Sequence, residues 1–208
     1  MNRNLPINAG HIARDIEALA AITEPGHPWT RRAFSPLFPE GRAYIEAKMK
    51  AAGLETRIDA AGNLIGRRTG RKPWLGTIMV GSHSDTVPDG GRFDGVAGVV
   101  SALEVARALS DQAIELDHDL EIVDFLAEEV SIFGVSCIGS RGMTGQLPEA
   151  WLSRVSGGLD LAEGIAEMGG EPGVLAQQKR PDLAGFLELH IEQGPVLEAE
   201  REDIGIVT

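Results

Sequence analysis

The chain has 208 residues, enough for one domain with a real hydrophobic core. Its formal net charge of −12 argues against nucleic-acid binding, because an acidic surface repels phosphate backbones. Cys137 is the only cysteine, which excludes an intrachain disulfide and a thiolate zinc cluster and is typical of a reducing compartment.

The sequence contains no segment that predicts secretion or membrane insertion. Residues 1–6 lack the apolar stretch of a secretory signal. No run of about 18 apolar residues, the length needed to span a bilayer, occurs anywhere. We therefore expect a soluble cytoplasmic protein that has neither nucleic acid nor a membrane as its partner.

Apolar periodicity and turn residues divide the chain into alternating helices and strands. The first predicted elements are helices at 7–22 and 39–52, a hairpin of strands at 55–59 and 64–67, and a strand at 74–82. They are followed by a helix at 95–109, a strand at 120–127, short helices at 149–154 and 160–168, a strand at 186–191, and the start of a strand at 203–208. This order predicts an α/β fold, a three-layer sandwich of helices on a mixed, mainly parallel sheet.

Three predicted strands end in side chains that can bind metal: His83 with Asp85, Glu128 with Glu129, and His190 with Glu192. In open α/β sheets ligands bind at the carboxyl ends of the strands, so these three ends can converge on one site. The loop after the first strand adds Asp94, and the glycines around it allow the tight turn that would bring its carboxylate over a metal. The pattern therefore favours a metal site.

Each of these pieces also has a structural interpretation when it is taken alone. A histidine at a strand end is often structural, but Asp85 points the same way as His83 and can fix the imidazole tautomer. Glu128 and Glu129 can be a solvated loop pair, or one can bind metal while the other accepts a proton from water. The glycine-rich loop around Asp94 can be no more than a turn.

Other chemistries have weaker support in the sequence. No P-loop motif occurs. Residues 134–138 (Gly-Val-Ser-Cys-Ile) lack the closing glycine of a nucleophile elbow. Cys137 has apolar neighbours and is interpreted as a packed residue.

Taken together, the motifs resemble a known family. Residues 81–88 (Gly-Ser-His-Ser-Asp-Thr-Val-Pro), 91–95 and 125–129 look like the M20 metallopeptidase superfamily. Residues 59–64, 133–142 and 188–195 are similar to its hydantoinase/carbamoylase branch, which includes N-carbamoyl-L-amino-acid hydrolases, β-ureidopropionases and allantoate amidohydrolases. The resemblance covers nearly the whole chain in the expected order.

The resemblance implies a two-metal site and a cis peptide bond between Asp94 and Gly95. The roles it implies are metal binding by His83 and His190, bridging by Asp94, binding of the second metal by Glu129, general base catalysis by Glu128, orientation of His83 by Asp85, and substrate binding by Gln193.

The activity implied by the resemblance is that of a metal-dependent amidohydrolase. It would cleave the C–N bond of a small-molecule ureido or carbamoyl substrate with a metal-bound hydroxide, and Glu128 would move the protons. Zinc suits mixed histidine and carboxylate ligands, and manganese, cobalt or nickel also fit. Two alternatives stay open: an M20 aminopeptidase or aminoacylase that acts on peptide or acyl bonds, and a non-catalytic metal-binding remnant.

Members of this family are about twice as long as this chain. The resemblance therefore implies that residues 1–208 are the N-terminal portion of a zinc-exopeptidase-like catalytic domain, without the inserted dimerisation domain and the C-terminal part. The full-length family is homodimeric and holds two divalent cations. For this chain alone we expect one cation or none, impaired catalysis, and an exposed sheet edge that favours self-association.

Overall fold

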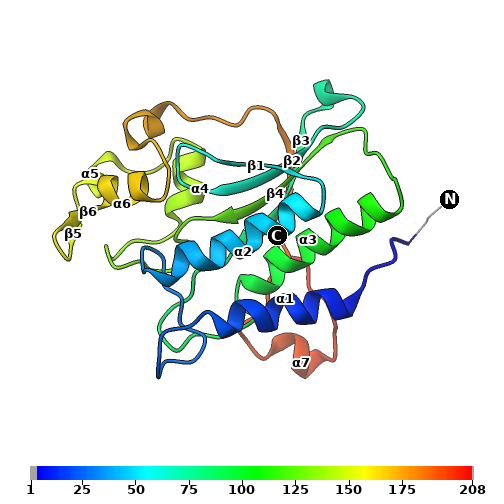
Figure 1. Cartoon of the computed structure of the whole chain (residues 1–208), viewed down its shortest axis with the longest axis horizontal. Coiled ribbons are helices and arrows are strands. Elements are labelled where there is room, and N and C mark those ends of the chain that lie inside the picture. The colour runs from blue at the N-terminus through cyan, green and yellow to red at the C-terminus, as the bar shows by residue number, and fades with distance from the viewer. Residues whose placement is uncertain (1–3, 208) are drawn as a thin grey trace.

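The computed structural model describes residues 4–207, and a five-stranded sheet runs through it (Figure 1). From edge to edge the strands are β1 (Glu55–Ile58), β2 (Leu64–Arg68), β4 (Asp119–Phe125), β3 (Thr77–His83) and β7 (Leu183–Leu187). β1, β2 and β4 are antiparallel neighbours, whereas β4, β3 and β7 run parallel. The predicted α/β fold with a mixed sheet is confirmed, and the parallel pairings are confined to β4, β3 and β7.

Helices cover the sheet on one face, and shorter elements lie beyond its ends (Figure 1). On that face α3 (Val96–Asp111) packs on β3 and β4, α2 (Leu37–Ala51) packs on β1 and β2, and α1 (Ala9–Ala21) packs on α3. The other face packs on Met143 of α4 (Ile138–Met143). The remaining elements are α5 (Glu149–Leu152), β5 (Val155–Ser156), β6 (Leu159–Asp160), α6 (Leu161–Glu167), α7 (Val196–Glu200) and two 3-10 helices (Pro73–Leu75 and Pro172–Gln177).

The central helix α3 shows why the loop before it has a fixed position. Val99, Val100 and Leu103 are fully buried at one-, three- and four-residue steps, so one side of the helix is closely packed against the sheet. Burial of each such side chain contributes roughly 1.5–3 kcal/mol. Because α3 begins at Val96, directly after the glycine-rich loop, this packing also fixes where Asp94 lies.

Several predicted boundaries differ from the structure. The strand predicted at 186–191 lies at 183–187, because its ladder with β3 ends at the pair Val80–Leu187, and His190 therefore follows the strand in a loop. The strand predicted at 74–82 begins at Thr77, after a 3-10 turn. Residues 203–207 form no strand, because no described strand pairs with them, and Thr208 lies outside the described residues.

β7 lies at the edge of the sheet and pairs only with β3 among the described strands. Its side chains Phe186 and Leu187 are 44% and 62% exposed, so the described part of the chain has the predicted exposed edge, and this edge is apolar. No described helix is both long and apolar enough to cross a membrane.

Candidate metal centre

Three of the predicted ligands come together at the carboxyl end of the parallel strands. His83 is the last residue of β3, Asp94 lies in the loop before α3, and His190 lies three residues beyond β7. One ligand atom from each of these residues lies within 4.8 Å of the other two. Nε2 of His190 is 3.1 Å from Oδ1 of Asp94, and Nε2 of His83 is 4.0 Å from the same oxygen. These are the residue types and the convergence that a divalent cation requires.

The hydrogen bonds of His83 and His190 leave one ring nitrogen of each, Nε2, free to bind a cation. Nδ1 of His83 is 3.0 Å from the carbonyl oxygen of Asp85, and Nδ1 of His190 is 2.8 Å from the carbonyl oxygen of Ile191. A carbonyl oxygen only accepts, so each Nδ1 must carry the proton. In the neutral imidazole each Nε2 then has a free lone pair, and both face Asp94.

Oδ1 of Asp94 provides an independent test of whether a cation fits. This oxygen is buried and has no hydrogen-bond partner among the described residues. An unpartnered buried carboxylate oxygen is costly unless it meets positive charge. Since it lies between the Nε2 atoms of His83 and His190, a cation bound by these three residues would satisfy it.

The turn that carries Asp94 depends on Gly95. Gly95 has a φ of +62°, and a Cβ atom at this position would lie 2.4 Å from the carbonyl oxygen of His83 and 2.5 Å from its ring. Only glycine fits both the backbone angle and the space. The expected cis bond between Asp94 and Gly95 is wrong, since the described residues contain no cis peptide bond and the chain reverses at Gly95 instead.

Asp85 connects His83 to the pair of glutamates. Its Oδ1 accepts a hydrogen bond from the backbone N–H of Glu128 at 3.2 Å, and its Oδ2 accepts one from the N–H of Glu129 at 3.1 Å. Its Oδ1 lies 3.5 Å from Nδ1 of His83, whose hydrogen bond goes to the Asp85 carbonyl. Burial lowers the pKa of His83, but hydrogen bonding and charge from Asp85, with the charge of Glu128, outweigh it and raise this pKa to about 9.

The two glutamates occupy different positions. Oε2 of Glu128 is 3.5 Å from Nε2 of His83, and the Glu128 side chain is 38% exposed, so it faces both the cluster and solvent. Glu129 is not part of the three-residue cluster. Burial raises the pKa of Glu129, and the negative charge of Asp94 raises it further, so the two carboxylates are close enough to interact. The predicted strand at 120–127 would be extended at Ala127, but the chain turns there, with a φ of +49°.

Gln193 also reaches the cluster. Its Nε2 donates a hydrogen bond to Oδ2 of Asp94 at 2.5 Å, so Gln193 holds the carboxylate oxygen that does not face the histidines. The family resemblance implies substrate binding for this residue, and that role stays a prediction.

Buried charges beneath the site were missed by the sequence reasoning. Asp124 in β4 is fully buried, and burial raises its pKa against the opposing charge of Arg42. Arg31 and Arg42 are 2% and 6% exposed. An aspartate inside the otherwise apolar run Ile122-Val123-Asp124-Phe125 is the one sequence signal that pointed to them, because charged residues are almost never fully buried unless they are paired.

Comparison with known proteins shows which family this chain resembles. The family model described as peptidase family M28 matches residues 63–184. An N-carbamoyl-L-amino-acid amidohydrolase from Paenarthrobacter aurescens is 40% identical over 204 residues, which are 96% of this chain and 50% of that protein. A ureidoglycolate hydrolase from Oryza sativa subsp. japonica is 37% identical over 210 residues, 97% of this chain and 43% of that protein.

A solved structure agrees with these sequence matches. The crystal structure of a hydantoinase/carbamoylase family amidase from Burkholderia multivorans has a TM-score of 0.84 and 37% identity, over 95% of this chain and 48% of that chain. The chain spans about half the length of the curated relatives that it matches. The resemblance to the hydantoinase/carbamoylase amidohydrolases is therefore confirmed, whereas the placement in the M20 superfamily stays a prediction. With more than half of its residues matched by one family model, the chain belongs to peptidase family M28.

Proposed function

We propose that this chain forms the metal-binding part of an amidohydrolase that cleaves the C–N bond of a ureido or carbamoyl group. The observation that carries the proposal is the cluster of His83, Asp94 and His190 with Glu128 beside it. The relatives support the substrate class, since they are named for N-carbamoyl-amino acids and ureidoglycolate.

His83, Asp94 and His190 would hold a divalent cation. Zinc is the first candidate, because two imidazoles and a carboxylate with one open position are a ligand set that catalytic zinc sites use. Manganese, cobalt and nickel are the alternatives. When it is bound, such a cation lowers the pKa of water and polarises a carbonyl oxygen.

Glu128 is the group that we propose to move protons. Its carboxylate lies beside His83 and is open to solvent, so it can reach both an attacking water and the leaving nitrogen of a substrate. Glu128 would take the proton from the water as the C–O bond forms, and would give it to the nitrogen as the C–N bond breaks. Asp85 fixes this glutamate by accepting the hydrogen bond of its backbone N–H.

A second cation would have fewer ligands in this chain. We propose Asp94 and Glu129 for it, and two carboxylates hold a divalent cation weakly compared with three or four ligands. We further propose that residues 1–208 are one part of a longer catalytic unit, that the remaining ligand comes from outside them, and that the complete enzyme is a homodimer. On this proposal the isolated chain binds one cation well and turns over substrate poorly or not at all.

The test compares a site variant with a matched histidine variant outside the site. His190→Ala removes a proposed ligand. His118→Ala removes a histidine that directly precedes β4 and whose Nδ1 contacts the carbonyl oxygen of Gly76. We expect one zinc ion per chain in the parent and in His118→Ala, measured by elemental analysis after dialysis, and a large loss of zinc in His190→Ala. Equal zinc content in all three proteins would sink the proposed site.

The reaction is tested on the same samples. Release of ammonium from N-carbamoyl-amino acids and from allantoate measures the proposed activity, and hydrolysis of dipeptides and acyl-amino acids measures the aminopeptidase or aminoacylase alternative. Turnover of dipeptides alone would replace the proposed substrate class. Bound zinc with no turnover of any substrate, even after the remaining part of a full-length relative is added, would favour the non-catalytic remnant.

A further inference from the structure

A buried salt bridge between Asp124 and Arg42 lies next to the segment that carries His83. Asp124 in β4 is completely buried, and its Oδ2 lies 3.3 Å from Nε of Arg42 in α2. The guanidinium of Arg42 also donates hydrogen bonds to the carbonyl oxygens of Asp124 and Gly62. Two charges taken out of water cost several kcal/mol each unless their geometry is good, so this pair is costly to bury between α2 and the sheet.

Asp124 uses the same oxygen to hold Ser84. The hydroxyl of Ser84 donates a hydrogen bond to Oδ2 of Asp124 at 2.9 Å, and Ser84 is itself fully buried. Ser84 stands between His83 and Asp85, so its side chain anchors the peptide that joins the proposed cation ligand to the residue that holds Glu128.

A second buried arginine holds the main chain of the same residue. Arg31 donates a hydrogen bond to the carbonyl oxygen of Ser84 at 2.8 Å, and its own backbone N–H donates to Oγ1 of Thr86 at 2.8 Å. Ser84 is therefore fixed by its hydroxyl from one side and by its carbonyl from the other. Neither the Arg31 nor the Asp124 side chain is part of the three-residue cluster, and both form hydrogen bonds with Ser84, the residue next to His83.

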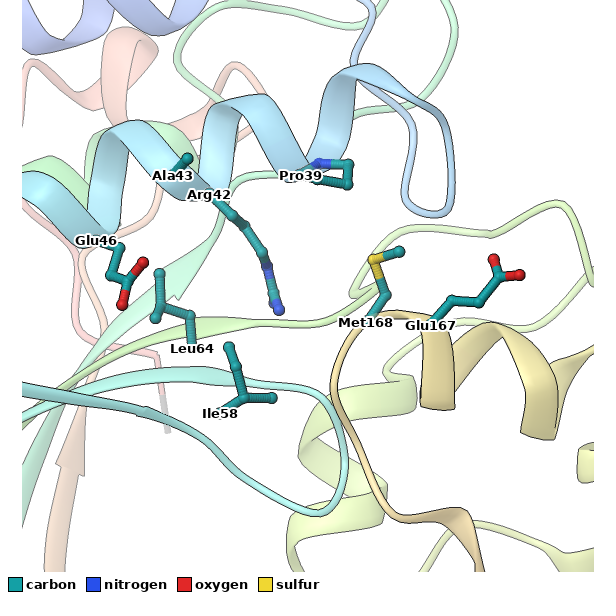
Figure 2. A pocket seen from close by; sticks show the side chains of 8 residues that line it. All are labelled: Pro39, Arg42, Ala43, Glu46, Ile58, Leu64, Glu167 and Met168. Carbon is teal, nitrogen blue, oxygen red and sulfur yellow. The ribbon is translucent and has the colours of Figure 1, made fainter.

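Arg42 is accessible from a cavity on the far side of these contacts. Figure 2 shows its side chain extending from α2 toward the strands. The cavity has a volume of about 200 Å³ and lies between α2, the β1–β2 hairpin and the end of α6, where Ile58, Leu64 and Met168 line it. Arg42 thus stands between this cavity and Asp124 and is buried without being closely packed on every side.

We propose that Asp124, supported by Arg42, is a positioning residue for the cation site and acts on His83 through the hydroxyl of Ser84. This inference rests on the proposed function, because it assumes that His83 binds a cation. The contact sets the direction of the strand end, so that Nε2 of His83 faces Asp94 while the Asp85 carbonyl stays within reach of Nδ1. If these hydroxyls only stabilised the fold, removing one at either end of β3 would have the same effect on cation binding.

The experiment compares two buried hydroxyls at opposite ends of the same strand. Ser84→Ala removes the hydroxyl next to His83. Thr77→Val removes the hydroxyl that donates to Oδ2 of Asp182 at 3.3 Å, at the first residue of β3, where Thr77 is 1% exposed. Both lose one hydroxyl–carboxylate hydrogen bond, and urea unfolding confirms that each variant is folded and measures its stability.

Cobalt binding gives the readout, because the visible absorption of Co²⁺ depends on the arrangement of its ligands. We expect Ser84→Ala to bind Co²⁺ roughly 10- to 100-fold more weakly than the parent, as for the loss of other groups that orient ligands, and with a changed spectrum. Thr77→Val is expected to keep the parent's affinity and spectrum. Parent-like binding by Ser84→Ala, or an equal loss in both variants, would overturn the positioning role.

A double-mutant cycle tests whether Asp124 acts through Ser84. Asp124→Asn alters the acceptor, and if the two residues act as one unit, the variant with both changes binds Co²⁺ no more weakly than Ser84→Ala alone. Additive losses would overturn the proposal. A parent chain that binds no Co²⁺ would instead remove the proposed cation site, so the two failures can be told apart from the parent alone.

Discussion

Asn63 offers the sharpest test of how the loop with the two glutamates is held. The ladder between β2 and β4 ends at the pair Leu64–Asp124, and the side chain of Asn63 continues it. Its Oδ1 accepts a hydrogen bond from the backbone N–H of Leu126 at 2.9 Å, and its Nδ2 donates to the carbonyl oxygen of Gly139 at 3.0 Å and to Oδ2 of Asp59 at 2.9 Å. Asn63→Ala removes all three contacts at a fully buried position.

The expected cost follows from the groups that lose their partner. The N–H of Leu126 and Oδ2 of Asp59 have no other described hydrogen bond. A buried group left unpaired costs about 1–3 kcal/mol, which applies in full to the N–H of buried Leu126, and partly buried Asp59 lies near the lower end of that range. Asn63→Ala should therefore lower the free energy of unfolding by about 2–4 kcal/mol in total. That is a large share of the roughly 5–15 kcal/mol that holds a typical domain together.

Urea unfolding measures this loss against a matched control. Asn8→Ala removes the amide side chain that caps α1, where Oδ1 accepts the N–H of Gly10 at 2.9 Å on an exposed surface. Loss of such a cap costs about 1 kcal/mol. If Asn63→Ala lost no more stability than Asn8→Ala, the side chain of Asn63 would not hold the loop and the reasoning would be refuted.

Three further predictions concern titration, turn geometry and the cation. Burial and the hydrogen bond to Asp15 raise the pKa of Tyr44, the only tyrosine, to about 12. The contribution of the protonated Tyr44 to folding stability is therefore present below pH 10 and is lost as the pH rises toward 12. Tyrosinate absorbance in the folded protein near pH 10 would contradict this prediction. Gly95→Ala places a Cβ 2.5 Å from the His83 ring and should weaken zinc binding more than about tenfold in equilibrium dialysis, whereas unchanged affinity would contradict the turn argument. Free zinc at 100 times its dissociation constant should raise the free energy of unfolding by about 2.7 kcal/mol, reversibly with a chelator, and a similar rise in His190→Ala would point to a different site.

The sequence predicted the parts of the site that depend on local pattern. The apolar run before His83 forms a strand that ends at His83, and Glu128 and Glu129 follow the end of β4 by three and four residues. The rule that ligands gather at the carboxyl ends of parallel strands predicted that His83 and His190 converge, and the glycine-rich loop predicted that Asp94 joins them; the structure brings these three residues together. These features were predictable because each arises from residues close in the chain or from a general property of parallel sheets.

Other features depend on contacts between distant residues and had no periodic signal. The carboxylate of Asp85 holds the N–H groups of residues more than forty positions away, and α4 is a six-residue helix with two glycines that forms where residues 137–139 bond back to 126–128. Short helices of this kind have little stability of their own. The strand predicted to end near His190 was misplaced for the same reason, because its limit is set by pairing with β3.

The distribution of ligands over the chain explains why one proposed cation should be independent of the other. His83 ends β3, His190 follows the neighbouring parallel strand β7, and Asp94 is fixed by the packing of α3 on β3 and β4, so all three depend on one rigid part of the fold. Glu129 depends on a different support, the loop held by Asp85 and Asn63. Disturbing that loop should therefore impair Glu128 and Glu129 before it impairs the binding of the first cation. Loss of both functions together in Asn63→Ala would mean that the disturbance reaches His83, either through Asp85, which bonds both groups, or through the direct contact of Glu128 with His83.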